Sequence, residues 1–260
     1  INRVKLHTDF VGPIQSGLCK MLVIGLGNHK GCSAVHEEAP EVFADAIEET
    51  ARLILQKAPV GFGIAILENA YDKTYAVEAV PAEHLVEREK ELVQIAKGNM
   101  PYIMLDEADV IVCGAIGKDI SGAGFDPNIL GRSSVLKQFV LHIPRYQRLV
   151  LCDVTPASHG NGIGVGLFDV ITKKVAEQLD LESMYANAIA CNCLGDASVP
   201  CTVDDEETAI RVALKCCRNI DRDHPRIIRI QNTLHLGEIE VSEALLDAVR
   251  ADSRMSLIEN

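Results

Sequence analysis

The sequence contains no tryptophan, and aromatic residues make up only 4% of its 260 residues. Aliphatic side chains must therefore supply most of any core, and the apolar fraction of 48% is ample for one. A chain of this length has room for one large domain or two small ones.

Positive charge is also scarce, because 25 lysines and arginines stand against 37 acidic residues and leave a formal net charge of −12. This balance argues against nucleic acid as a partner, since its phosphates are neutralised by lysine and arginine. A small anionic substrate is compatible with the composition if its site carries local positive charge.

Long hydrophobic runs are missing as well. No stretch reaches the roughly 18 apolar residues that span a membrane, and no secretion signal opens the sequence. The nine cysteines form no disulfide-like framework, and the pairs Cys191-x-Cys193 and Cys216-Cys217 do not match zinc spacing. We interpret them mainly as buried apolar residues, with a redox or metal role as the alternative, and expect a cytoplasmic protein without membrane contact.

Residues 7–36 concentrate groups that carry chemistry, namely His7, His29, His36 and Lys20. Histidine can shuttle protons or bind a metal, and lysine can act as a cation or a nucleophile. Glycine lets the backbone approach a ligand closely, and this stretch has five: Gly12, Gly17, Gly25, Gly27 and Gly31. The plain alternative is a glycine-rich connection between core elements with ordinary surface histidines.

The spacing within this stretch resembles the nickel-pincer-nucleotide racemase family, which includes lactate racemase. That family has a histidine, a Ser-Gly-x-x-Lys signature, a glycine, and a second histidine sixteen residues after the lysine. The matching positions here are His7, Ser16-Gly17-Leu18-Cys19-Lys20, Gly25 and His36. The distance from His7 to Lys20 is three residues longer than in lactate racemase, and Leu18-Cys19 replaces Gly-Arg, which indicates a divergent branch.

Weaker resemblance to the same family continues along the chain. Residues 60–80 resemble its strand pair, residues 109–128 its strand and glycine-rich substrate loop, and residues 158–164 a His-Gly-Gly loop. The sequence begins at Ile1 without methionine, at a point that lies inside the family's first domain. The family's Asp-His-Thr-Arg phosphate motif and its other catalytic histidine are not found, so we expect the N-terminal part to be missing.

The resemblance implies a racemase or epimerase of a 2-hydroxy acid that removes and returns hydride through a nickel-pincer nucleotide, a pyridinium dithio mononucleotide bearing nickel. It implies that Lys20 is joined covalently to this cofactor, that His36 is the protein's nickel ligand, and that His7 is one of two bases. Ser16, Gly17 and Gly25 would line the cofactor. Planar coordination of this kind suits Ni(II), and His29 is the substitute for either histidine.

Strand and helix patterns predict an α/β fold of two lobes, each a small sheet flanked by helices, with the active site at their interface. We assign residues 1–98 to cofactor binding and residues 99–260 to substrate binding and closure, because a helix stop at Gly98 precedes Pro101. The expected strands are 20–26, 60–67, 74–80, 109–115, 148–154 and 226–230. We expect a helix near Phe43, with Glu37, Glu38 and Glu41 in its first turn. Two further helices are expected at 81–97 and 167–179, and two more begin at Asp204 and Ser242.

Substrate contacts are expected in loops after the second-half strands, where ligands of α/β sheets sit. The candidates are Lys118 for a carboxylate, Asp119, Asn128 and Arg132 for hydroxyls, and His159. For each the competing interpretation is an ordinary surface loop. No dinucleotide-binding GxGxxG pattern is present there, which counts against a nicotinamide dehydrogenase.

Two further alternatives stay open. One is a hydrolase or lyase with a simple metal at His7, His29 and His36. The other is a non-catalytic fragment that keeps the fold. Homo-oligomerisation is also left open by the sequence.

Overall fold

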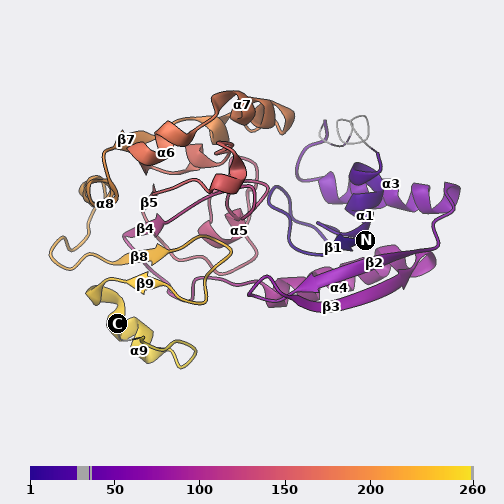
Figure 1. Cartoon of the computed structure of the whole chain (residues 1–260). Coiled ribbons are helices and arrows are strands. Elements are labelled where there is room, and N and C mark those ends of the chain that lie inside the picture. The colour runs from indigo at the N-terminus through magenta and orange to yellow at the C-terminus, as the bar shows by residue number, and fades with distance from the viewer. Residues whose placement is uncertain (28–34, 36, 259–260) are drawn as a thin grey trace. The chain divides into compact units, whose positions relative to one another are not determined.

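The computed structural model describes residues 1–27, 35 and 37–258. The chain is mixed α/β, with a three-stranded and a six-stranded sheet, both flanked by helices (Figure 1), as the α/β prediction required. It divides into two compact units. Unit 1 comprises Ile1–Pro101 and Val135–Leu141, and unit 2 comprises Tyr102–Ser134 and His142–Asn260.

The sheet of unit 1 has the order β1-β2-β3, with bounds Asn2–Arg3, Phe62–Glu68 and Thr74–Pro81. β1 runs parallel to β2, and β2 and β3 form an antiparallel hairpin. The Asn69 side chain accepts the backbone N–H groups of Tyr71 and Lys73 and so closes the turn. The two predicted strands and their connecting turn are confirmed.

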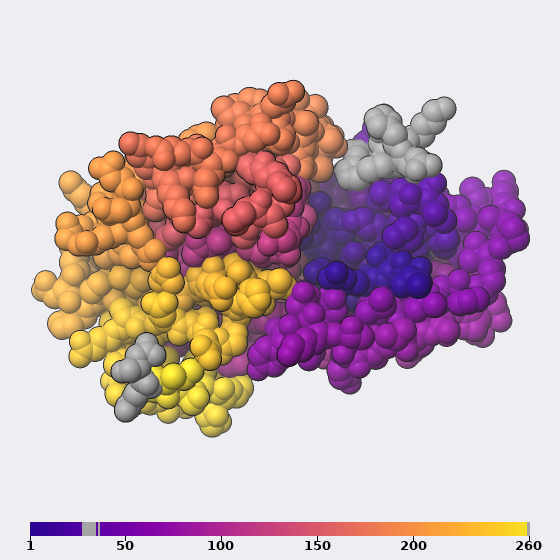
Figure 2. All heavy atoms as spheres, in the orientation of Figure 1, coloured from indigo at the N-terminus to yellow at the C-terminus, as the bar shows by residue number. Residues whose placement is uncertain are grey.

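Three helices pack together in unit 1: α1 (Leu18–Lys20), α3 (Phe43–Lys57) and α4 (Leu85–Asn99), the last after a short 3-10 turn. α3 buries Phe43, Ile47 and Ala51, the predicted apolar spacing, and its end at Lys57 precedes Pro59. α1 and α4 both pack on β2. Figure 2 shows the first residues, in indigo, at the surface beside the purple residues of the same unit.

Two expectations for unit 1 are wrong. Residues 20–26 are not a strand, because α1 continues directly into a π-helix, η1 (Met21–Gly25). The buried residues Leu18, Cys19, Leu22 and Val23 recur at helical spacing, which a short apolar run hides. Glu37, Glu38 and Glu41 precede α3 rather than forming its first turn, where the acidic residue is Asp45.

The sheet of unit 2 has the order β7-β6-β5-β4-β8-β9 and is parallel except for β9. α8 (Glu206–Lys215) packs on β4, β5 and β6, and its Ala209 and Ala213 meet Val110 and Val150 in one core cluster. The strands are β4 (Val110–Cys113), β5 (Arg148–Leu151), β6 (Val170–Thr172), β7 (Cys201–Val203), β8 (Ile227–Ile230) and β9 (Glu240–Val241). The predicted strands at 109–115, 148–154 and 226–230 are confirmed.

The remaining helices of unit 2 are α5 (Pro127–Leu130), α6 (Lys173–Gln178), α7 (Leu181–Ala190) and α9 (Leu246–Ala251). The predicted helix at 167–179 is wrong in its first half, because Val170–Thr172 is a fully buried strand and Thr172 caps α6. Asp205 rather than Asp204 caps α8, accepting the Thr208 N–H at 2.8 Å. Ser242 precedes the last helical turn without capping it through its side chain.

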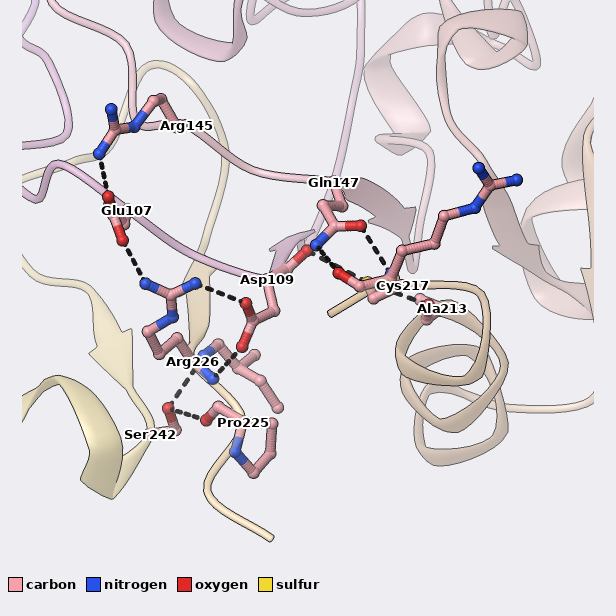
Figure 3. Close-up of polar contacts among 11 residues, drawn as sticks. Glu107, Asp109, Arg145, Gln147, Ala213, Cys217, Pro225, Arg226 and Ser242 are labelled. Carbon is pink, nitrogen blue, oxygen red and sulfur yellow. Dashed lines mark hydrogen bonds and ion pairs between the residues drawn. The ribbon is translucent and has the colours of Figure 1, made fainter. Parts of the chain in front are cut away.

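A polar network ties the starts of β4 and β8 together (Figure 3). Asp109, 1% exposed, accepts the backbone N–H and the guanidinium of Arg226, both at 2.8 Å. Glu107 pairs with Arg226 and with Arg145. Because a buried carboxylate is tolerated only when paired, this network is a structural anchor of the sheet.

Candidate functional site

Lys20 lies on a short helical segment, α1 and η1, which buries Leu18, Cys19, Leu22 and Val23. Its Nζ contacts Nε2 of His7, thirteen residues earlier in the chain. The His7 side chain is 10% exposed and stacks on Phe10 at 4.3 Å, and Phe10 packs on Phe43. The structure therefore brings together two of the residues singled out by the sequence.

The chain engages both ring nitrogens of His7. The Nδ1 atom accepts the Asp9 backbone N–H at 3.1 Å, and Nε2 contacts Lys20 Nζ. The Asp9 contact helps to fix the orientation of the ring, so that Nε2 faces the lysine amine. A lysine amine is nucleophilic in its uncharged form, and an imidazole is a group that can exchange a proton with it.

The loop that carries His7 is held by its own hydrogen bonds. The His7 backbone N–H donates to Gln15 Oε1 at 2.8 Å, and Gln15 Nε2 donates to the Gly12 carbonyl at 3.1 Å. Lys5 and Ser16 form an antiparallel bridge through their backbones. Ser16 therefore helps close the loop that positions His7, whereas its predicted contact with a cofactor stays a prediction.

Glu89, on α4, is a site residue that the sequence reasoning missed. It is 0% exposed, and its Oε2 accepts the Cys19 backbone N–H at 2.8 Å. Burial raises the pKa of Glu89 to about 7, against the opposing effect of hydrogen bonds from the Cys19 and Leu18 backbones. A signal was available, because position 89 falls between Leu85 and Leu92 on the buried face of the helix.

Two of the predicted cofactor glycines have local packing reasons. A Cβ on Gly17 would lie 2.5 Å from Oε1 of Glu89, and a Cβ on Gly25 would meet the Met21 sulfur. Cys19, between them in the chain, is fully buried, and burial together with Glu89 raises the pKa of its thiol well above the ordinary range. Cys19 is thus an inert core residue rather than a competing nucleophile.

The predicted nickel ligand His36, and its substitute His29, lie outside the described residues. Within residues 1–27, 35 and 37–258, no group of three histidine, cysteine or acidic side chains is arranged to hold a metal ion.

In unit 2, Lys118 and Asp119 follow β4 and meet the loop after β5. The Lys118 backbone N–H donates to Ser158 Oγ at 2.7 Å, and its Nζ donates to the Gly122 carbonyl at 2.6 Å. Thr155 donates to Asp119 and lies 2.9 Å from Ser158 Oγ. The loop after β5 therefore contributes two hydroxyl groups that the sequence reasoning had not singled out.

The glycines of these loops allow close loop packing. Gly124 and Gly164 have φ angles of +88° and +94°, and a Cβ on either would meet a carbonyl oxygen of the other loop, that of Ile163 or Ala123. A Cβ on Gly117 would meet Thr155 Oγ1. The glycine-rich pattern is explained here by contact between two loops.

The other three predicted substrate residues are held by their own chain. Asn128, 1% exposed, donates from its backbone and its side chain to Asp126 Oδ1. Arg132 pairs with Asp169 at 2.6 Å, donates to the Leu167 carbonyl, and lies over the Tyr146 ring. His159 ends a 3-10 turn with φ +48°. Their substrate roles stay predictions.

A cavity of about 400 Å³ opens at the carboxyl ends of strands β4 to β7. Its charges are largely paired, Lys174 with Asp153 at 2.5 Å and Arg229 with Glu206 at 2.7 Å. Two more carboxylates, Asp204 and Asp205, give the lining an excess of negative charge. Such a lining does not suit an anionic hydroxy acid.

No family model, curated protein or solved structure matches this chain. Within the described part of the chain, every helix is too short or too polar to cross a membrane.

Proposed function

We propose that this chain acts in a racemase or epimerase of 2-hydroxy acids that uses a nickel-pincer nucleotide, with Lys20 as the amine that joins the nucleotide. The observation that supports this most is the contact between Lys20 Nζ and His7 Nε2, with Nδ1 of His7 accepting the Asp9 N–H. It places the two motif residues side by side, with the lysine amine next to a group that can exchange a proton with it.

The described residues fit a nickel-pincer nucleotide in one respect, the amine of Lys20. Lys20 would hold the nucleotide through its amine, and His7 lies beside that amine as a group that can exchange a proton with it. The nickel ligand would be His36. When bound, this cofactor supplies reversible hydride transfer at the carbon that bears the substrate hydroxyl.

His7 would be one of the two bases that take the hydroxyl proton of the substrate, and its ring is held by Phe10 and by the Asp9 N–H. Lys118 would pair with the carboxylate of a small anionic substrate, and Asp119 with a hydroxyl. Asn128, Arg132 and His159 remain further candidates for substrate contacts.

A simple metal site at His7, His29 and His36 has less support. The chain itself engages both ring nitrogens of His7, through Asp9 and Lys20, so metal binding there would displace one of these contacts. A cytoplasmic location is part of the proposal, in keeping with eight free cysteines among the described residues.

The test is the mass of the Lys20 peptide in the complete protein, made together with the enzymes that synthesise the cofactor. We expect the wild type to gain mass at this peptide and Lys20→Arg to lose the gain, because guanidinium is a far poorer nucleophile than an amine. Lys57→Arg, at an exposed lysine of the same unit, is the control and should keep it. Protein that carries stoichiometric nickel cofactor with an unmodified Lys20 would refute the covalent role.

A further inference from the structure

Glu89 is a fully buried carboxyl group from α4 that contacts the start of the segment carrying Lys20. Its Oε2 accepts the Cys19 N–H at 2.8 Å, and its Oε1 has no hydrogen-bond partner. A buried carboxyl oxygen without a partner is costly, so packing alone would favour an apolar side chain at this position. The position of Glu89 calls for a role beyond packing.

We propose that Glu89 is a positioning residue for Lys20: its carboxyl group accepts the first backbone N–H groups of α1 and thereby fixes the place of the Lys20 amine against His7. This proposal rests on the proposed function only in the cofactor-binding role that it gives to Lys20. The positioning itself concerns contacts within unit 1.

The start of the segment is held at two points. The Gly17 carbonyl accepts Asn2 Nδ2 at 2.8 Å and the Met21 N–H at 3.0 Å, while Glu89 accepts the Cys19 N–H two residues further on. Lys20 follows Cys19 directly, so a change at the Cys19 N–H rotates the turn on which the Lys20 side chain stands. Loss of the Glu89 contact would leave the Cys19 N–H without this acceptor, although Asn2 and the Lys5–Ser16 bridge would still hold the residues before it.

Charged and titratable groups from three helices surround the Glu89 carboxyl group. The Cys19 thiol faces it from α1, and Glu48 and Arg52 of α3 act on the same thiol. On α4 itself, Lys90 pairs with Glu48, and Arg88 pairs with Glu78 of β3 and with Glu91. Since burial raises the pKa of Glu89 to about 7, its carboxyl changes from acid to carboxylate across neutral pH. A carboxylate accepts N–H groups more strongly than the acid does.

The experiment measures how fast Lys20 reacts with a small acylating reagent in the protein without cofactor, as a ratio to exposed Lys57 in the same digest. A solvated lysine is almost fully protonated at neutral pH, so the exposed Lys57 gives a constant reference for changes in the surroundings of Lys20. We expect Glu89→Ala to lower the ratio by at least roughly threefold, as for loss of a cap. Glu89→Gln retains an acceptor and should stay near the wild type at pH 8.

The pH profile separates positioning from a general structural role. Between pH 6 and 8 the wild-type ratio should rise as Glu89 ionises, whereas the ratio of Glu89→Gln should stay flat. Glu91→Gln, at an exposed residue on the same helix, should behave as the wild type. An unchanged ratio in folded Glu89→Ala, or a pH step that persists in Glu89→Gln, would overturn the proposal. If Glu89→Ala does not fold, the profile of Glu89→Gln decides.

The outcome is independent of the cofactor. A pH step that is lost in Glu89→Gln, together with a Lys20 peptide that gains no mass in the loaded protein, would uphold the positioning role and reject the covalent one.

Discussion

At the scale of single residues, Glu89 ties stability to pH. The folded chain keeps a proton on Glu89 up to a pKa of about 7, whereas the ordinary value is 4.5. Between these values the folded state binds one more proton than the unfolded state, so the free energy of unfolding falls as the pH rises. Above the folded pKa the effect levels off.

Glu89→Gln cannot titrate and should lose this dependence. Between pH 5 and pH 8 the free energy of unfolding of the wild type should fall by up to roughly 3 kcal/mol relative to that of Glu89→Gln. Urea unfolding at a series of pH values measures the difference. Parallel pH profiles for the two proteins would contradict the buried-acid interpretation.

The sequence could single out His7 and Lys20 but not their contact. The contact depends on a loop closed by the Lys5–Ser16 bridge and by Gln15, none of which the residue types predict. Burial of Glu89 could be read only from its place between Leu85 and Leu92, against the general rule that a glutamate on a charged helix is solvated. Its partner, the Cys19 N–H, comes from a distant part of the sequence.

At the scale of elements, the helices and strands that could be predicted are the long ones with a regular spacing of apolar residues. The β2–β3 hairpin and α3 followed from alternating or helical apolar spacing with clear stops. The strand predicted at 20–26 failed because a seven-residue apolar run fits both a strand and a helix. The helix predicted at 167–179 failed because a buried strand of three residues leaves no period to read.

The two glycine-rich loops of unit 2 give an element-scale prediction. Gly164→Ala places a side chain at φ +94° and against the Ala123 carbonyl, so it should cost at least about 2 kcal/mol of stability. Gly122→Ala is the matched control in the same pair of loops, because nothing lies within 4 Å of its Cβ position. It should change stability by no more than about 0.5 kcal/mol. Thermal unfolding of both variants tests this, and equal shifts would argue against close loop packing.

At the scale of the whole molecule, the chain leaves unit 1 at Pro101 and returns to it at Val135–Leu141. Val140 and Leu141 pack against the core of unit 1. A division of the sequence at one point would therefore separate unit 1 from part of its own core.

Leu141→Ala should loosen unit 1 alone. Loss of a partly buried leucine side chain costs on the order of 1 kcal/mol, so amide exchange in α4 should speed up roughly fivefold. Exchange in β4, within unit 2, should stay at the wild-type rate. Gln138→Ala, at an exposed residue of the same segment, is the control. Hydrogen exchange read by mass spectrometry measures both units, and faster exchange in β4 would show that they open together.

Gly17 and Glu89 share one small volume, because a Cβ on the first would lie 2.5 Å from a carboxyl oxygen of the second. The order in which these two positions can change during evolution is therefore constrained. A lineage that first acquires Gly17→Ala meets a clash, whereas one that first shortens residue 89 opens the space that a side chain at 17 needs. A side chain at position 17 would have to push the Glu89 carboxyl group away from the Cys19 N–H, so the two positions should tend to be inherited as a pair.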